Sequence, residues 1–262
     1  MDSGLYTATS GMIAEYQRLQ VIANNIANAD TAGFKTDRTF FELVRGAMAR
    51  APHGDAPIRA NDQTLAAGTR FDPLSGSLRQ TGNPFDVAVE GDGYFMVGTP
   101  GGVKYTRDGG FRLAGDGTLV NASGLAALDP NGNTMRIDLA AGGAAGGRSN
   151  DTGGPIVIDE AGRIFRGEQE LGQLGLRDFP QAQARLRKVG DALFAPVRAD
   201  DSGEATVSRV RQGHLEGSNV NILREMAEMI ESQRAFESYQ KIVVSIANDM
   251  DRKAATELGS IA

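Results

Sequence analysis

Apolar positions near the amino end recur at alternating spacings of four and three residues, which is typical of a helix that packs along a narrow stripe. Four large apolar residues, seven positions apart, form this stripe: Leu5, Met12, Leu19 and Ile26. The pattern predicts a helix of roughly 25 residues, about 37 Å long. After Asn28, Ala29 and Asp30, Gly33 is expected to take the left-handed conformation that ends helices, with Phe34 packing back onto the helix end.

The carboxyl end repeats the pattern and predicts a helix from about Val220 to about Leu258. Its stripe consists of Ile222, Met226, Met229, Phe236, Val243 and Met250. Gly217 precedes this helix, and the side-chain oxygen of Ser218 or Asn219 can cap its first turn. The charged residues around the stripe, such as Glu225, Glu228 and Arg224, are expected to flank it and to set partner and register.

Further apolar residues lie beside the two stripes: Ile13, Ile22, Leu223, Ile230, Tyr239 and Ile242. The two ends could form an intramolecular pair, parallel or antiparallel, as a stalk on the rest of the chain. Such a pair would leave these residues uncovered, so the surplus favours packing of several chains into a bundle. Burying ~500 Å² more per subunit would contribute on the order of 12 kcal/mol before ordering costs.

Between the two predicted helices the chain indicates β structure. Short apolar segments alternate with glycine-containing turns, and Asp108-Gly109 and Asp116-Gly117 suit tight hairpins. The expected strands are 86–89, 94–97, 104–107, 111–113, 118–121, 156–158, 163–165 and 171–179. The predicted fold is therefore α+β: long terminal helices in a coiled-coil layer, with a central antiparallel all-β domain. The expected domains are 1–35 with 218–262 for the helices, 36–85 with 201–217 as an extended arm, and 86–200 for the β domain.

The amino-acid composition and net charge exclude several classes of protein. The 34 glycines are concentrated in the middle, and with only 9 prolines and no repeat they do not indicate collagen. The net charge of −6 argues against nucleic acid as a partner, and the lack of cysteine excludes disulfides and thiolate metal sites. No cleavable signal or membrane-spanning run is apparent. We expect no cofactor, no metal and no catalytic residue.

One enzymatic alternative remains open, a polysaccharide-cleaving activity on the β domain. It requires two carboxylates in one cleft, for which Asp86 with Glu90 or Asp92 are candidates. Asp129, Asn131 and Asn133 imitate the start of a calcium loop, but Thr134 and Ala140 stand where its glycine and glutamate belong. A secreted adhesin with a helical stalk is a third possibility.

Two terminal motifs resemble the signatures of bacterial flagellar rod and hook proteins. VIANNIANADTAGFKT (residues 21–36) is similar to the amino-terminal signature, and LEGSNVN (215–221) with EMIESQRAFESYQK (228–241) to the carboxyl-terminal one. GDGYFMV (91–97) and YTRDGGFRL (105–113) resemble the opening of the family's β domain. Within the family, MDSGLYTATSGM and the short segment from Phe41 to Asp86 are more similar to the proximal than to the distal rod protein.

The resemblance implies a structural subunit of the flagellar basal-body rod in the periplasm. It implies passage through the flagellar export apparatus, and partners that are copies of the chain and other rod proteins. The terminal helices would form the inner layer of a tube that transmits torque and conducts exported subunits. The distal paralogue remains an alternative.

Asn24, Asn25 and Asn28 allow two interpretations. They could cap the helix end and form the turn, or they could make hydrogen bonds between subunits that fix the subunit stagger.

Overall fold

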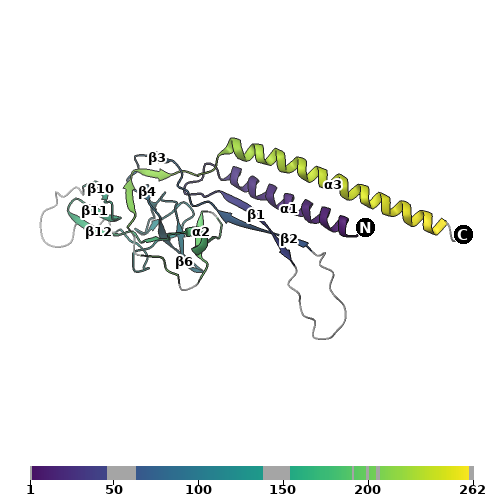
Figure 1. Cartoon of the computed structure of the whole chain (residues 1–262). Helices are drawn as coiled ribbons and strands as arrows, with labels where there is room; N and C mark the ends of the chain where they lie inside the picture. The colour runs from purple at the N-terminus through teal and green to yellow at the C-terminus, as the bar shows by residue number, and fades with distance from the viewer. Residues whose placement is uncertain are drawn as a thin grey trace, which may run out of the picture. The chain divides into compact units, whose positions relative to one another are not determined.

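A computed structural model describes residues 2–45, 63–137, 154–190, 192–198, 201–204 and 207–259. The chain forms two compact units (Figure 1). The helical unit comprises residues 1–27, 37–70 and 221–262, and the β unit comprises 28–36 and 71–220. The chain therefore passes between units four times. The expected arm does not coincide with either unit, because residues 37–70 belong to the helical unit and 71–85 to the β unit.

The helical unit contains both long helices that the hydrophobic pattern predicts. α1 spans Asp2–Ala27 and α3 spans Ile222–Gly259, each within about three residues of its expected bounds. Two strands from the expected arm, β1 (Asp37–Arg45) and β2 (Gln63–Phe71), pair with each other. Part of the expected extended arm therefore forms a two-stranded sheet.

The β unit consists of antiparallel sheets. The largest has eight strands, in the order β14-β15-β6-β5-β9-β8-β7, with β13 also paired to β5. A three-stranded sheet contains β10, β11 and β12, and two further pairs join β16 to β4 and β17 to β3. A short helix, α2 (Ala182–Arg185), precedes β14. The strands are β3 (Leu78–Gln80), β4 (Val87–Glu90), β5 (Gly93–Thr99), β6 (Gly102–Thr106), β7 (Arg112–Leu113), β8 (Leu119–Val120), β9 (Ala126–Ala127), β10 (Ile156–Ile158), β11 (Arg163–Arg166), β12 (Gln169–Gln173), β13 (Leu176–Asp178), β14 (Leu186–Lys188), β15 (Leu193–Pro196), β16 (Arg209–Gln212) and β17 (His214–Glu216).

Seven of the eight expected segments coincide with single strands, and 171–179 is divided between β12 and β13. Leu174 and Gly175 separate these two strands, because their amides donate to the carbonyls of Gly162 (2.8 Å) and Leu128 (2.7 Å). The strands of the β unit at 78–80, 126–127, 186–188, 193–196, 209–212 and 214–216 are not among the expected ones.

Strand β5 divides the interior of the β unit into two cores. Successive side chains of a strand point to opposite faces. Phe95 and Val97 belong to one apolar cluster, and Tyr94 and Met96 belong to the other. Both faces of β5 are therefore buried, which explains why its sequence GYFMVGT is apolar without alternation.

The two expected hairpin turns have different outcomes. At Asp116-Gly117 the prediction is confirmed: β7 pairs with β8 around it and Gly117 has a φ of 81°. At Asp108-Gly109 it is wrong, since β6 pairs with β5 and β15 and not with β7. Gly109 is required there for a different reason, because a side chain would collide with the Val87 carbonyl.

Candidate assembly site

The two long helices lie side by side and run antiparallel (Figure 1). Gly4 lies against Ile246, Gly11 against Tyr239, and Asn25 is hydrogen-bonded to Glu225. From one contact to the next, the residue number rises by seven or fourteen along α1 and falls by the same amount along α3. Seven residues are close to two helical turns, so these contacts form a continuous line along both helices.

Small residues let the helices approach closely. A Cβ atom placed on Gly11 would lie 2.7 Å from the Tyr239 ring, too close for any side chain there without movement of the tyrosine. Nearby, the rings of Tyr16 and Phe236 have centroids 6.4 Å apart. Among the described side chains of α1 and α3, Ile22 is the one large apolar residue that is fully buried.

Polar groups are buried between the helices instead. Asn25 is 1% exposed, and its side chain donates to Glu225 Oε2 (3.0 Å) and to the Asp37 carbonyl (2.9 Å) while accepting from the Asp37 amide (2.9 Å). Ser232 donates to Glu15 Oε2 at 2.6 Å. Because these groups are paired, they specify direction and register at little net cost.

Glu225 corrects an expectation from the sequence. It is expected to flank the stripe, but it is buried in the contact between the helices, where it accepts a hydrogen bond from Asn25. Glu228 does flank the interface, with ion pairs to Arg224 (3.0 Å) and Arg18 (3.7 Å).

The predicted stripes lie beside the line of closest contact. In α1 the four stripe residues are half-buried, and Met12 is displaced by about 100° around the helix from Gly11. In α3, Met229, Phe236 and Val243 are half-buried and the side chain of Met250 lies outside the described residues. Both stripes therefore retain apolar surface beyond the contacts within one chain. The stripe residues of α1 are Leu5, Met12, Leu19 and Ile26.

The first turns of α3 expose a continuous apolar patch. It consists of Ile222 (39% exposed), Leu223 (81%), Met226 (48%) and Ile230 (55%), and we call it the α3 patch. Met226 follows Ile222 by four residues and Leu223 by three, and Ile230 follows Met226 by four, so the four side chains lie within about 100° around the helix. Of the six residues expected beside the stripes, Ile13, Leu223, Ile230 and Ile242 are exposed, whereas Ile22 is buried and Tyr239 half-buried.

The cap of α3 is another correction. Asn221 is the capping residue, because its Oδ1 accepts the Arg224 amide at 3.1 Å, whereas Ser218 Oγ accepts only the Val220 amide at 3.3 Å. Asn219 reaches elsewhere, accepting from the amide and hydroxyl of Thr36 (2.7 and 2.8 Å). Ser218 and Asn219 therefore belong to the β unit rather than to the first turn of the helix.

The turn after α1 agrees with the sequence in two respects. Gly33 has a φ of 67°, the expected left-handed conformation. Asn28 acts as a turn former, accepting from the Thr31 hydroxyl at 3.2 Å. Phe34 is buried under the Lys188 ammonium, 3.4 Å from the ring centroid, and its packing onto the helix end stays a prediction. Asn24 is exposed, so a contact with another subunit stays a prediction for it.

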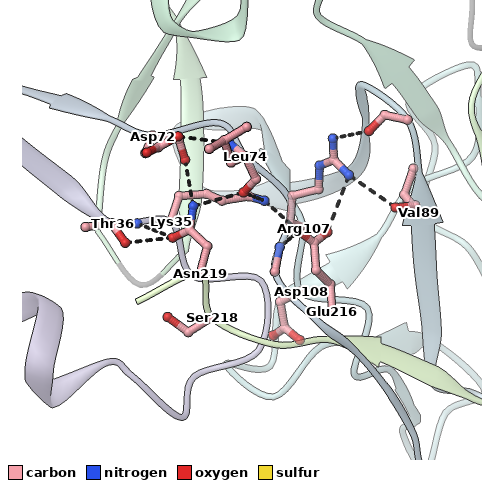
Figure 2. A network of polar contacts seen from close by, with 12 residues as sticks. Lys35, Thr36, Asp72, Leu74, Val89, Arg107, Asp108, Glu216, Ser218 and Asn219 are labelled. Atoms are coloured by element: carbon pink, nitrogen blue, oxygen red, sulfur yellow. Dashed lines mark hydrogen bonds and ion pairs between the residues drawn. The ribbon is translucent and has the colours of Figure 1, made fainter. Parts of the chain in front are cut away.

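A buried ionic network surrounds Glu216 in the β unit (Figure 2). Its carboxylate accepts from Lys35 Nζ at 2.5 Å and from Arg107 Nη1 at 3.4 Å, and all three side chains are almost fully buried. Burial lowers the pKa of Lys35, and the adjacent Glu216 opposes this shift. The sequence analysis did not identify these residues, although Lys35 and Glu216 are the charges within two otherwise uncharged stretches, AGFKT and HLEGSN.

Two carboxylates of the enzymatic alternative, those of Asp86 and Glu90, have different partners. Asp86 accepts from Asn83 at 2.9 Å, and Glu90 forms an ion pair with Arg211 at 3.0 Å. The calcium-like segment is closed internally, because Asp129 accepts the amides of Asn131 and Asn133. Within the described part of the chain, no group of acidic and histidine residues is suited to hold a metal, and no helix could cross a membrane.

Three family descriptions match successive parts of the chain. "Flagella basal body rod protein" matches residues 5–35, "Flagellar hook protein FlgE/F/G D1 domain" matches 88–165, and "Flagellar basal body rod FlgEFG protein C-terminal" matches 211–257. The first and third cover the paired helices, and the second covers much of the β unit. The class that the fold and these matches define is that of flagellar axial structural proteins.

Curated relatives cover nearly the whole chain. The flagellar basal-body rod protein FlgF of Caulobacter vibrioides is 31% identical over 100% of both chains, and FlgF of Mesorhizobium japonicum is 32% identical over 99% of both. FlgG of Bacillus subtilis is 33% identical over 92% of this chain and 94% of its own. The chain belongs to the flagellar basal-body rod protein family.

Proposed function

We propose that the chain is a structural subunit that assembles through its terminal helices into the tubular rod, which transmits torque and conducts exported subunits. In this proposal the long helices within residues 1–35 and 218–262 form a coiled-coil inner layer, 36–85 and 201–217 connect, and 86–200 form the β domain. Its partners are copies of itself, other rod proteins and, in transit, the flagellar export apparatus. The location is the rod of the basal body within the periplasm.

One observation carries the proposal: the helical unit exposes apolar surface that its own chain leaves uncovered. Leu223 is 81% exposed on a helix whose family match is a rod-protein segment. Four apolar side chains on one helical face offer a contact for another helix, and hiding them would stabilise an assembled state.

We assign the chain to the proximal part of the rod. The support is the opening MDSGLYTATSGM together with the short segment after the first helix, which resemble the proximal rod protein. Coverage and identity do not separate the two paralogues, because FlgF relatives align with 99–100% of this chain at 31–32% identity and FlgG of Borreliella burgdorferi aligns with 97% of it at 32%. The distal paralogue is the second candidate.

The test is a change on the α3 patch that leaves the intramolecular helix pair intact. We expect Leu223→Asp to remove the protein from isolated basal bodies and to abolish swimming, because a carboxylate would be buried between subunits. Val197→Asp is the matched control, since Val197 is also exposed (57%) but lies in the β unit. Normal incorporation of Leu223→Asp would refute assembly through this face.

A further inference from the structure

The connections between the two units leave the β unit close to one another in the network of Figure 2. Asn219 lies two residues before the chain enters the helical unit at Asn221, Thr36 is the last residue before the passage to Asp37, and Asp72 follows the return at Phe71. These positions are far apart in sequence, so their proximity is a property of the fold.

Asn219 joins three of these connections through one side chain. Its Oδ1 accepts from the amide and hydroxyl of Thr36, and its Nδ2 donates to the carbonyls of Asp72 (3.1 Å) and Leu74 (2.9 Å). The Asp72 amide in turn donates to the Thr36 carbonyl at 2.8 Å. An amide side chain is suited to this task because it carries both donors and acceptors.

Glu216 holds the segment before Thr36 in the same region. Its backbone carbonyl accepts the Gly33 amide at 2.8 Å, and its carboxylate accepts from Lys35 and from the Gly76 amide at 3.0 Å. Lys35 also donates to the Leu74 carbonyl at 2.8 Å. On the far side, Arg107 ties the carboxylate to the carbonyls of Val89 and Gly91 in the β unit.

Two glycines, Gly33 and Gly76, stand where backbone segments approach too closely for a side chain. A side chain at Gly33 would collide with the backbone of Arg107 and Asp108, and one at Gly76 would collide with the Gly217 carbonyl. The segments around Gly76 and Gly217 are thus packed backbone to backbone, and the segment around Gly33 is packed in the same way on the strand end at Arg107 and Asp108.

We propose that Asn219, Glu216 and Lys35 form a clasp that fixes, in the free chain, the positions at which the connections beside Thr36, Asp72 and Asn219 leave the β unit. They are positioning residues. The role of the clasp in the rod, to pass load through several strands instead of one linker, rests on the proposed function. The presence of the clasp in the free chain is independent of that proposed function.

Amide hydrogen exchange on the full-length monomer tests the clasp. In Asn219→Ala we expect the amides of Asp72 and Gly33 to exchange at least about tenfold faster, although neither donates to Asn219, because the clasp couples the connections. Ser218→Ala is the matched control, since Ser218 bonds only the nearby Val220 amide. Acceleration confined to Thr36, whose amide bonds Asn219 directly, would overturn the proposal.

A second variant addresses the ionic half of the clasp. Glu216→Gln leaves two buried cations without a counter-charge and can unfold the unit. Lys35→Met leaves Glu216 paired with Arg107, and we expect faster exchange at Gly33, Gly76 and Asp72 with the β core still protected. Unchanged exchange at all three amides would overturn the proposal. Failure of the wild-type chain to enter rods would instead contradict the proposed function, so the two failures are distinguishable.

Discussion

The two units of this protein are stabilised by different kinds of interior. The β unit buries large aromatic and aliphatic side chains in two clusters, including Phe95, Ile164 and Phe194. The helical unit buries alanine, asparagine, glutamate and serine between its helices and leaves large apolar residues exposed. Since apolar burial is the main favourable term in folding, we expect the β unit to be stable by itself, and in the proposed rod the helix pair would gain further stability from neighbouring chains.

The largest effect is expected at Phe236. Its ring contacts Tyr16 and it is half-buried in the helix pair, so Phe236→Asp disrupts the helical unit while leaving the β unit unchanged. We expect loss of the protein from basal bodies and loss of motility, measured by immunoblot of isolated basal bodies and by swimming assays. Ser245→Asp, an exposed position of the same helix, is the control. Normal swimming of Phe236→Asp would refute the role of this helix in packing.

A large effect in the other unit is expected at Phe194. Its fully buried ring packs 4.8 Å from that of Phe71 and 5.3 Å from that of Tyr94. Phe194→Ala is expected to lower the free energy of unfolding of the β unit by about 3–5 kcal/mol. Urea unfolding followed by circular dichroism measures this, and Val157→Ala, at an exposed position, is expected to change it by less than about 0.5 kcal/mol. A loss under about 1 kcal/mol for Phe194→Ala would show that the core is not the source of stability.

Alanine substitutions at the two glycines that face α3 are expected to change the stability of the helix pair in opposite directions. Gly11→Ala introduces a methyl group against the Tyr239 ring, and we expect it to destabilise the helix pair by about 1–3 kcal/mol. Gly4→Ala places its Cβ 3.9 Å from Ile246, an ordinary contact, so its higher helix propensity is expected to stabilise by about 0.5–1 kcal/mol. Helicity at 222 nm against temperature distinguishes them, and equal effects of the two changes would contradict this geometry.

The smallest effect concerns acid stability. Hydrogen bonds from the Arg185 guanidinium lower the pKa of Asp201 to about 2. A lowered pKa means that the ion pair stabilises the β unit above the unfolded value of about 3.8, and that this contribution disappears as the pH falls toward 2. We expect Asp201→Asn to cost about 1 kcal/mol at pH 7 and nothing near pH 2, because the pair is near the surface and screened. A cost that is the same at both pH values would contradict the assignment.

The sequence predicted the elements better than it predicted their contacts. Regular apolar spacing located α1 and α3 within about three residues, because periodicity is a local property. Large side chains mark the stripe of Leu5 and Met12 in the sequence, whereas Gly4 and Gly11 lie directly against side chains of α3. Small residues are a weak signal unless the opposing helix is known.

Long-range polar contacts could not be predicted from sequence. Asn25 and Glu225 are 200 residues apart, and nothing local distinguishes Glu225 from the solvated Glu228. Asn219 was interpreted as a cap because its residue type favours caps, but the fold brings Thr36 and Asp72 within its reach. The role of each of these residues therefore depends on its partner in the folded chain, which the residue type alone does not predict.

Amide hydrogen exchange of the full-length protein, free in dilute solution and then assembled with rod partners, tests the central claim most directly. In the free chain we expect the amides of α1 and α3 to exchange at least a hundredfold faster than those of Phe95, Ile164 and Phe194. On assembly the helices should become as protected as the β unit. Helices already as protected as these core strands in the monomer, with no gain on assembly, would contradict the account.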